Sequence, residues 1–161
     1  MVLIGPSGAG KSSFARKHFR STEVLSSDYC RGLVSDDEND QAATNDAFEV
    51  LHCILAKRLG AGKLTVVDAT NVQPEGRRRL IELARQYGVP PIAIVLNLPE
   101  CVCLERNRAR PDRQFGPEVI RNQAQELRQS IGGLECEGFR RIYLLHDVES
   151  IDGAAIERQP L

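Results

Sequence analysis

Tryptophan is absent from this chain of 161 residues, and aromatic side chains make up only 5% of it. Proteins that bind single-stranded nucleic acid along its length stack the bases on several aromatic rings, so a wide stacking platform is not expected here. The formal net charge is only −1, which argues against a broad basic surface for long nucleic acid. A local basic groove that grips only the end of a strand is compatible with this charge.

Zinc spacing, a disulfide framework and membrane spans are also missing. The five cysteines form no C-x-x-C pair, and they do not group with the three histidines at zinc-ligand spacing, since only His52 and Cys53 are neighbours. Their odd number is typical of a reduced cytosolic protein, in which they are expected as small buried apolar side chains. No apolar run approaches the roughly 20 residues of a membrane span, and no basic signal-peptide segment opens the chain. We therefore expect a cytoplasmic protein without a membrane partner.

The pattern of the chain predicts one α/β domain over residues 1–161. Apolar content of 42% and charged content of 27% are ordinary globular values, and short apolar runs alternate with longer amphipathic stretches. Strands are expected over residues 2–4, 23–26, 64–68, 91–96 and 142–145. Helices are expected over residues 12–19, 40–59, 74–87, 99–110 and 117–131. The result is a mostly parallel five-stranded sheet flanked by helices with right-handed crossovers, whose strand order is left open.

A phosphate-binding loop follows the first strand. Residues 5–12 read GPSGAGKS and match G-x-x-x-x-G-K-[ST] in full. The glycines let backbone N–H groups turn inward around an anion, and the next helix adds its N-terminal dipole. Lys11 can reach the β and γ phosphates, and the Ser12 hydroxyl can ligate Mg²⁺. ATP or another nucleoside triphosphate with Mg²⁺ is therefore predicted at Gly5, Ser7, Gly8, Ala9, Gly10, Lys11, Ser12 and Ser13.

Other motifs narrow the class of nucleotide-binding protein. The guanine motif N-K-x-D of GTPases is absent. Motor or AAA-type ATPases usually follow the acidic residue of the third strand with a glutamate that activates water, whereas Ala69 follows Asp68 here. Asp68 itself is a candidate to hold Mg²⁺ through water, together with Ser12, or to contact the acceptor. A small kinase of the P-loop fold is the hypothesis that these observations favour.

A kinase needs a base near the acceptor hydroxyl, and Asp28 is the candidate. It follows the second strand, whose carboxyl end borders the same crevice as the phosphate loop in a parallel sheet. Arg31 lies three residues further on, so one helical turn would place it beside Asp28, where it could orient the carboxylate and reach the transferring phosphate. The competing interpretation is a helix cap and a solvated arginine.

Arginines near a proline predict a lid over the phosphates. Arg106 and Arg110 share a helix face and Pro111 ends that helix, so both could neutralise charge on the β and γ oxygens. Arg108 and Arg113 are weaker candidates, and a solvated basic helix end is the alternative. Asn71 could bind acceptor phosphate or act as a turn residue. Arg77, Arg78 and Arg79 are interpreted as the solvated face of an amphipathic helix.

These residues together resemble the kinase module of bacterial Pnkp, a family of RNA end-healing and sealing enzymes. The resemblance is carried by residues 5–12, by SSDYCRGLV at 26–34, by VDATN at 67–71, by Arg106 and Arg110, and by the acidic stretch 36–40 and the closing ERQP. It runs over nearly the whole chain and is therefore more specific than the phosphate loop alone.

The resemblance implies transfer of the γ phosphate of ATP or another NTP to a 5′-OH end of RNA or DNA. Carried over by position, Lys11 and Ser12 bind phosphates and Mg²⁺, Asp28 is the general base, Arg31 positions it, and Arg106 and Arg110 clamp the phosphates. In the family this module precedes phosphatase and ligase modules and works with a 3′-terminal RNA methyltransferase. Those modules do not fit in 161 residues, so we expect an excised or partial chain.

Two alternatives stay open on the sequence. One is a small-molecule kinase of the same fold, which would explain the near-neutral charge equally well. The other is a nucleotide-dependent switch without an acceptor, in which substitution of Asp28 would change turnover little. A preference for RNA over DNA does not follow, because a 5′ end can be bound without the 2′-OH.

Overall fold

The computed structural model describes residues 1–111 and 115–158. Its strands are β1 (Val2–Ile4), β2 (Val24–Ser26), β3 (Val66–Asp68), β4 (Ile92–Leu96) and β5 (Arg141–Leu145). They form one five-stranded sheet in the order β2-β3-β1-β4-β5, and each described pairing is parallel. The predicted parallel sheet is confirmed. The strand order, which the sequence left open, puts β1 at the centre and makes β2 and β5 the edges.

The helices are α1 (Lys11–His18), α2 (Ser27–Ser35), α3 (Thr44–Gly60), α4 (Pro74–Gln86), α5 (Glu100–Arg108), α6 (Pro117–Ser130), α7 (Leu134–Glu137) and α8 (Val148–Asp152). Short 3-10 turns lie at Ser21–Glu23, Gln41–Ala43 and Ile131–Gly133. The five expected helices are present, whereas α7 and α8 were not predicted and α2 was expected only as the single helical turn that carries Asp28 and Arg31. Within the described part of the chain, each helix is too short or too polar to cross a bilayer.

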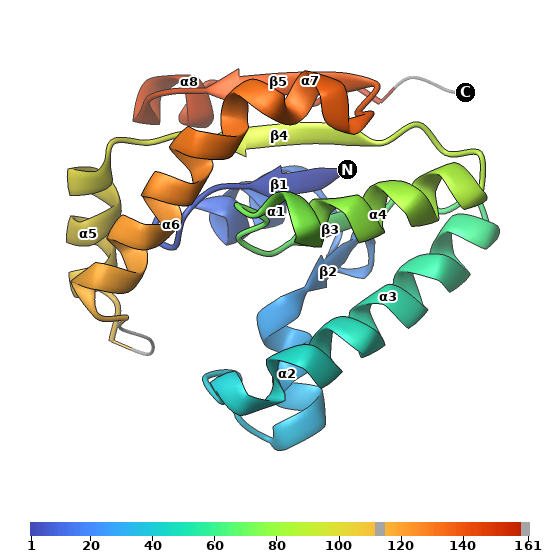
Figure 1. Cartoon of the computed structure of the whole chain (residues 1–161), viewed down its shortest axis with the longest axis horizontal. Helices are drawn as coiled ribbons and strands as arrows, with labels where there is room; N and C mark the ends of the chain where they lie inside the picture. The colour runs from blue at the N-terminus through green and yellow to red at the C-terminus, as the bar shows by residue number, and fades with distance from the viewer. Residues whose placement is uncertain (112–114, 159–161) are drawn as a thin grey trace.

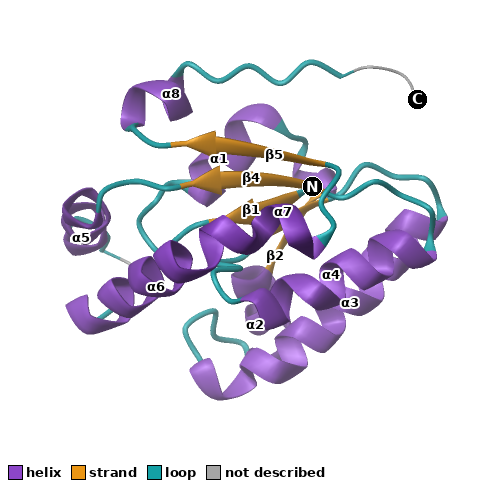
Figure 2. Ribbon diagram, turned by 45° about the horizontal axis from the view of Figure 1, so that its top comes forward, coloured by secondary structure: helices purple, strands orange, loops and turns teal. Residues whose placement is uncertain are grey.

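Helices cover both faces of the sheet (Figures 1 and 2). Successive strand residues point to opposite faces, and because parallel strands are buried on both sides they are apolar at nearly every position. Val2 and Ile4 pack with α3, α4 and α7, whereas Leu3 packs with α1, α5 and α8. The carboxyl ends of all five strands therefore meet at one edge of the molecule, where β1 leads into the phosphate loop.

Arg77 corrects one sequence prediction. Arg78 and Arg79 are exposed as expected, but Arg77 is 0% exposed and is the largest of the fully buried side chains. Its Nε and Nη2 donate to the two carboxylate oxygens of Glu137, and Nη1 donates to the carbonyl oxygens of Asn71 (2.8 Å) and Val72 (2.9 Å). Arg77 is therefore a buried anchor that ties the start of α4 to α7.

The segment after α8 joins the two edges of the sheet. It runs back across the α1 side after β5 (Figure 2), and Ala154 and Ile156 pack against the core there. Arg158 then forms a forked pair with Glu23, with both N–O distances 2.8 Å. Glu23 also accepts from the backbone N–H of Arg20 and immediately precedes β2.

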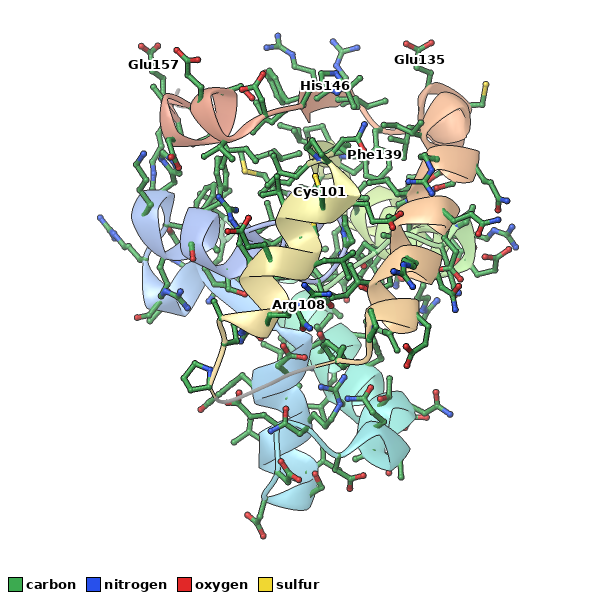
Figure 3. All side chains as sticks on the ribbon, turned by 90° about the vertical axis from the view of Figure 1, so that its left-hand side faces the viewer. Cys101, Arg108, Glu135, Phe139, His146 and Glu157 are labelled. Carbon is green, nitrogen blue, oxygen red and sulfur yellow. The ribbon has the colours of Figure 1, made fainter. Side chains whose placement is uncertain are left out.

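The cysteines are only partly as expected. All five are unpaired, in line with a reduced protein, and Cys30 and Cys103 are buried. The remaining three lie at exposed positions, as Figure 3 shows for Cys101 on the outer side of α5. The prediction of buried apolar cysteines is therefore wrong for Cys53, Cys101 and Cys136, which stand on outward-facing positions of their helices.

Candidate active site

The loop between β1 and α1 has the backbone geometry of an anion nest. Gly8 and Gly10 take the left-handed conformation, with φ of 84° and 94°. Gly10 precedes the first residue of α1, and no side chain caps this helix. The first N–H groups of α1 are therefore directed at the space above the loop, where a phosphate would be stabilised by them and by the helix dipole.

Helix α5 crosses directly over this loop. A Cβ placed on Gly8 would lie 2.4 Å from the carbonyl oxygen of Cys103, so only glycine permits this approach. A Cβ on Gly10 would lie 3.2 Å from Nη1 of Arg106, which places that guanidinium against the loop. Burial raises the pKa of the Cys103 thiol, so Cys103 is a neutral packing residue here. The phosphate loop and Arg106 are thus in close contact.

Lys11 and the loop are held by specific bonds. Lys11 is buried, and its Nζ donates to the carbonyl oxygens of Gly5 (2.8 Å) and Pro6 (2.9 Å). The backbone N–H of Ser7 donates to Oε1 of Gln123 on α6 at 2.8 Å. Gln123 was not among the residues predicted from the sequence. Its place in a helix beside the apolar residue Ala124 could be read from the sequence, but this place does not indicate that Gln123 contacts the phosphate loop.

One cleft of about 1480 Å³ brings most of the predicted site residues together. Ser7, Gly8, Gly10, Lys11, Ser12, Ser13, Asp28, Arg31, Asp68, Arg106 and Arg110 line it. Gly5 and Ala9, which were also predicted to bind the nucleotide, are buried and do not line the cleft. The N–H of Ala9 instead donates to the carbonyl of Pro6 within the loop.

The acceptor side is built at the start of α2. The Ser26 hydroxyl caps this helix by accepting from the N–H of Tyr29, which sets Asp28 in the first turn. Arg31 donates from Nη1 to Oδ1 of Asp28 and to the carbonyl of Glu38, both at 2.8 Å. The side chain of Arg31 is 5% exposed and that of Asp28 is 33% exposed. A buried cation thus orients a carboxylate that faces the cleft.

Asp68 and Ser12 form a donor set that fits Mg²⁺. Asp68 is 6% exposed, pairs with Ser26 across the β2–β3 ladder, and lines the cleft with Ser12. The described residues contain no group of three or more His, Cys, Asp or Glu side chains that could enclose a metal. Mg²⁺ usually keeps several waters and uses one or two protein ligands plus substrate phosphates, so this sparse set suits it.

The C-terminal end of α5, which carries the predicted lid arginines, is anchored by Asn107, a residue that was not predicted from the sequence. Arg106 and Arg110 line the cleft, whereas Arg108 is exposed at the end of α5 (Figure 3). Asn107 is buried, donates from Nδ2 to the carbonyl of Phe115 at 2.8 Å, and accepts from its N–H at 3.1 Å. These two bonds close the connection between α5 and α6. Arg113 lies outside the described residues.

Asn71 is a turn residue. Its φ is 49°, a left-handed value that Asn tolerates better than most residues, and it is 7% exposed. Its Nδ2 donates to the carbonyl oxygens of Leu3 (2.8 Å) and Ala69 (3.3 Å). Of the two interpretations open for Asn71, the structure supports the turn, because its amide donates into the fold.

Comparison with known proteins gives a family and a fold. The model of the family described as AAA domain matches residues 1–134. The Arabidopsis thaliana protein named transcription factor bHLH140 is 29% identical over 163 residues, which cover 96% of this chain. The chain spans only 16% of the length of that relative.

Solved structures share the fold at low sequence identity. A putative kinase from Chloroflexus aurantiacus matches with a TM-score of 0.64 and 15% identity over 90% of this chain and 82% of the other. A gluconokinase from Sinorhizobium meliloti matches with a TM-score of 0.57 and 19% identity, over 94% of this chain and 83% of the gluconokinase. A shikimate kinase from Acinetobacter baumannii, in complex with shikimate, matches with a TM-score of 0.50 and 21% identity, over 94% of this chain and 86% of the shikimate kinase. The fold is therefore that of P-loop kinases.

Ala69 qualifies what the family name implies for this chain. The sequence argued against a motor or AAA-type ATPase because this position lacks the expected glutamate. Ala69 is 6% exposed and directly follows Asp68 in the structure. The AAA domain match therefore includes a chain without a carboxylate at this position.

Proposed function

We propose that this chain, which belongs to the AAA domain family and has a P-loop kinase fold, is a polynucleotide 5′-hydroxyl kinase. It would transfer the γ phosphate of ATP or another NTP to the 5′-OH end of RNA or DNA. The resemblance to the kinase module of bacterial Pnkp supports this substrate class.

The donor half of the site would hold the triphosphate. Backbone N–H groups of the loop bind the β phosphate, and Lys11 exchanges its two carbonyl partners for phosphate oxygens. Arg106 already lies against Gly10, so it can contact the γ phosphate without a large movement. Mg²⁺, held by Ser12 and through water by Asp68, would neutralise phosphate charge and help to align the triphosphate.

The acceptor half would activate the hydroxyl. Asp28 accepts the hydroxyl proton as the acceptor oxygen bonds to the γ phosphorus, while the bond from that phosphorus to the β–γ bridging oxygen breaks and the nucleoside diphosphate is released. Arg31 holds Oδ1 of Asp28 in a 2.8 Å bond, which fixes the carboxylate toward the cleft where the acceptor would lie. Arg31 is thus a positioning residue in this arrangement.

The extent of the cleft is the observation that carries the choice of a polymer acceptor. Beyond Asp28 the cleft continues along the outer edge of β2, where Ser21, Thr22 and Val24 line it. Tyr29, which is 60% exposed, stands beside the proposed base and can stack on a terminal nucleobase. A small acceptor would not need this open extension, whereas a strand end must continue out of the site.

A small-molecule kinase is the second candidate, and the comparisons fit it at least as well. A gluconokinase and a shikimate kinase are among the solved structures of similar fold. The near-neutral charge of the chain also agrees with a small acceptor.

The partners and the location of the whole protein are proposals as well. The chain covers 16% of its longer relative, so the activity of a whole protein cannot be taken from this domain alone. We propose phosphatase and ligase modules in the same polypeptide and a 3′-terminal RNA methyltransferase as partner, as the resemblance implies. Cytoplasmic location is likewise a proposal.

A transfer assay decides between the two acceptor classes. The protein is incubated with Mg²⁺ and ATP labelled at the γ phosphate, together with a 5′-OH RNA, a 5′-OH DNA, gluconate or shikimate. Label at the 5′ end of an oligonucleotide is the expected result. Label in gluconate or shikimate alone would overturn the polynucleotide assignment and support the second candidate.

A further inference from the structure

The two ways out of the acceptor site differ in charge. One arm of the cleft passes between α2 and α3, where Glu38 and Gln41 line it and the exposed acidic residues Asp36 and Asp37 lie close by. The other arm passes between α1 and the edge of β2, where the cations Arg16 and Lys17 line it with Ser21, Thr22 and one acidic residue, Asp152. The small net charge of the chain therefore hides a separation between an acidic exit and a basic exit.

The basic arm continues beyond the cleft. Arg20 is exposed and directly precedes the turn at Ser21–Glu23. Glu23 is the acidic residue of that turn, and Arg158 engages both of its carboxylate oxygens. Its negative charge is therefore neutralised at the point where a polyanion would pass. Lys17 donates to the carbonyl of Asp152, a bond that leaves its positive charge in place.

The spacing of these groups suits a chain rather than a single anion. Helix α1 rises by about 1.5 Å per residue, so Arg16 lies about 6 Å along the axis from Ser12, and Arg20 follows after the end of the helix. Opposite them, β2 is an edge strand without a neighbour on its outer side in the described sheet. No further described strand covers this side of β2, and the residues that line the groove there include hydroxyl groups, two cations and Asp152.

We propose that the strand downstream of the acceptor 5′ end leaves the site along this α1–β2 groove, with its phosphates beside Arg16 and Arg20. The proposal rests on the proposed polynucleotide kinase function and adds the direction of the strand. Phosphate contacts of this kind position a strand without reading its sequence, and they make affinity depend on salt. The acidic α2–α3 arm repels the same backbone.

Acceptor length separates this groove from the reacting centre. The steady-state kcat/KM is measured for thymidine 3′-phosphate, a dinucleotide, a hexamer and a 12-mer, with wild type, Arg16→Gln, Arg20→Gln and the double variant. We expect wild-type kcat/KM to rise with length and then level off. In the double variant, kcat/KM for the 12-mer should fall by about tenfold or more, mainly because KM rises. The kcat/KM for thymidine 3′-phosphate and the affinity for ATP should stay within about twofold of wild type.

Salt dependence gives an independent measurement. The logarithm of the binding constant decreases linearly with the logarithm of the salt concentration. The steepness of this decrease becomes smaller by about 0.7 for each phosphate of a single strand that the protein no longer neutralises. Removal of two cations in the double variant should therefore lower the slope for the 12-mer by about 1.4 and leave that for thymidine 3′-phosphate unchanged. Arg78→Gln with Arg79→Gln is the matched control, because both are exposed arginines that do not line the cleft.

Each result has a separate meaning. Equal losses for short and long acceptors, or an unchanged 12-mer, would overturn the α1–β2 path while the polynucleotide kinase assignment stands. An equal loss in the control pair would show general charge attraction and would also overturn the path. Absence of transfer to every oligonucleotide by the wild-type protein would instead refute the proposed function on which the path rests.

Discussion

Arg31 donates from Nη1 to Oδ1 of Asp28 at 2.8 Å, one turn apart on α2, with the arginine buried and the carboxylate open to the cleft. This pairing gives Asp28 a fixed orientation. Substitution of Asp28 by Asn keeps its size and its bonding capacity but removes the ability to accept a proton.

We expect Asp28→Asn to lower kcat by about 10²- to 10⁴-fold, the range of general base catalysis, with ATP affinity nearly unchanged. Single-turnover transfer and ATP titration measure the two quantities. Asp36→Asn is the control, because Asp36 is exposed with a φ of 59° and Asn tolerates that conformation. Unchanged turnover in Asp28→Asn would favour the nucleotide switch without an acceptor.

Arg77→Met should lower the free energy of unfolding by about 3–5 kcal/mol, because Glu137 is then left largely buried without its cation. Urea denaturation followed by circular dichroism measures this change. Arg78→Met, at an exposed position on the same helix, should stay within about 0.5 kcal/mol of wild type. A small effect of Arg77→Met would mean that Glu137 finds water or another donor.

Two glycine substitutions should have opposite signs. Gly8→Ala places a Cβ 2.4 Å from the Cys103 carbonyl at a left-handed φ, so it should cost more than about 1 kcal/mol and weaken ATP binding. Gly76→Ala, in α4 with no atom within 4 Å of the added Cβ, should gain about 0.5–1 kcal/mol. Thermal unfolding and ATP titration test both, and equal destabilisation would contradict the close packing of α5 on the loop.

The Glu23–Arg158 pair should make the free energy of unfolding depend on pH in the acidic range. The hydrogen bonds from Arg158, followed by the one from the Arg20 backbone, hold the pKa of Glu23 below its ordinary value of 4.5. A lowered folded pKa gives stability that is present above pH 4.5 and is lost as the pH falls through the folded pKa.

The measurement is the free energy of unfolding between about pH 3 and 6 for wild type and Arg158→Met. The variant should lose stability at pH 6 and show a flatter decline on acidification, because Glu23 then titrates closer to its unfolded value. Arg140→Met, at an exposed site, should follow the wild-type curve. Parallel curves for wild type and Arg158→Met would show that the fork contributes nothing to this dependence.

The sequence predicted the features that local chemistry controls. The GPSGAGKS loop, the apolar strands and the helices opened by Pro74 and Pro117 all depend on neighbouring residues, and each is present. The contact between Asp28 and Arg31 also follows from helix spacing. The catalytic roles of these residues stay predictions until the transfer assays are done.

The missed features depend on partners far away in the chain. Arg77 lies on the same helix face as Leu80, Ile81 and Ala84, so its spacing indicated burial, but its partner Glu137 is 60 residues away. Short helices such as α7 and α8 carry too few residues for a periodic signal.

Asn107 and Gln123 illustrate the same limit within the site. Asn107 fastens the turn to Phe115, and Gln123 reaches across to the loop at Ser7. Both are polar residues on helices, and the polarity of their side chains alone suggests that they face solvent. Their contacts exist only because α5 and α6 pack beside the phosphate loop.

The fork between Glu23 and Arg158 also orders the events of protein synthesis. Glu23 leaves the ribosome early, but its partner follows 135 residues later. The outer strand β2, which leads to Asp28, therefore lacks this fastening until Arg158 has been made. A nascent chain can pair β1, β3 and β4 and form the phosphate loop well before then. The Arg158 contact to the segment before β2 can therefore form only after the strands at the centre of the sheet have been made.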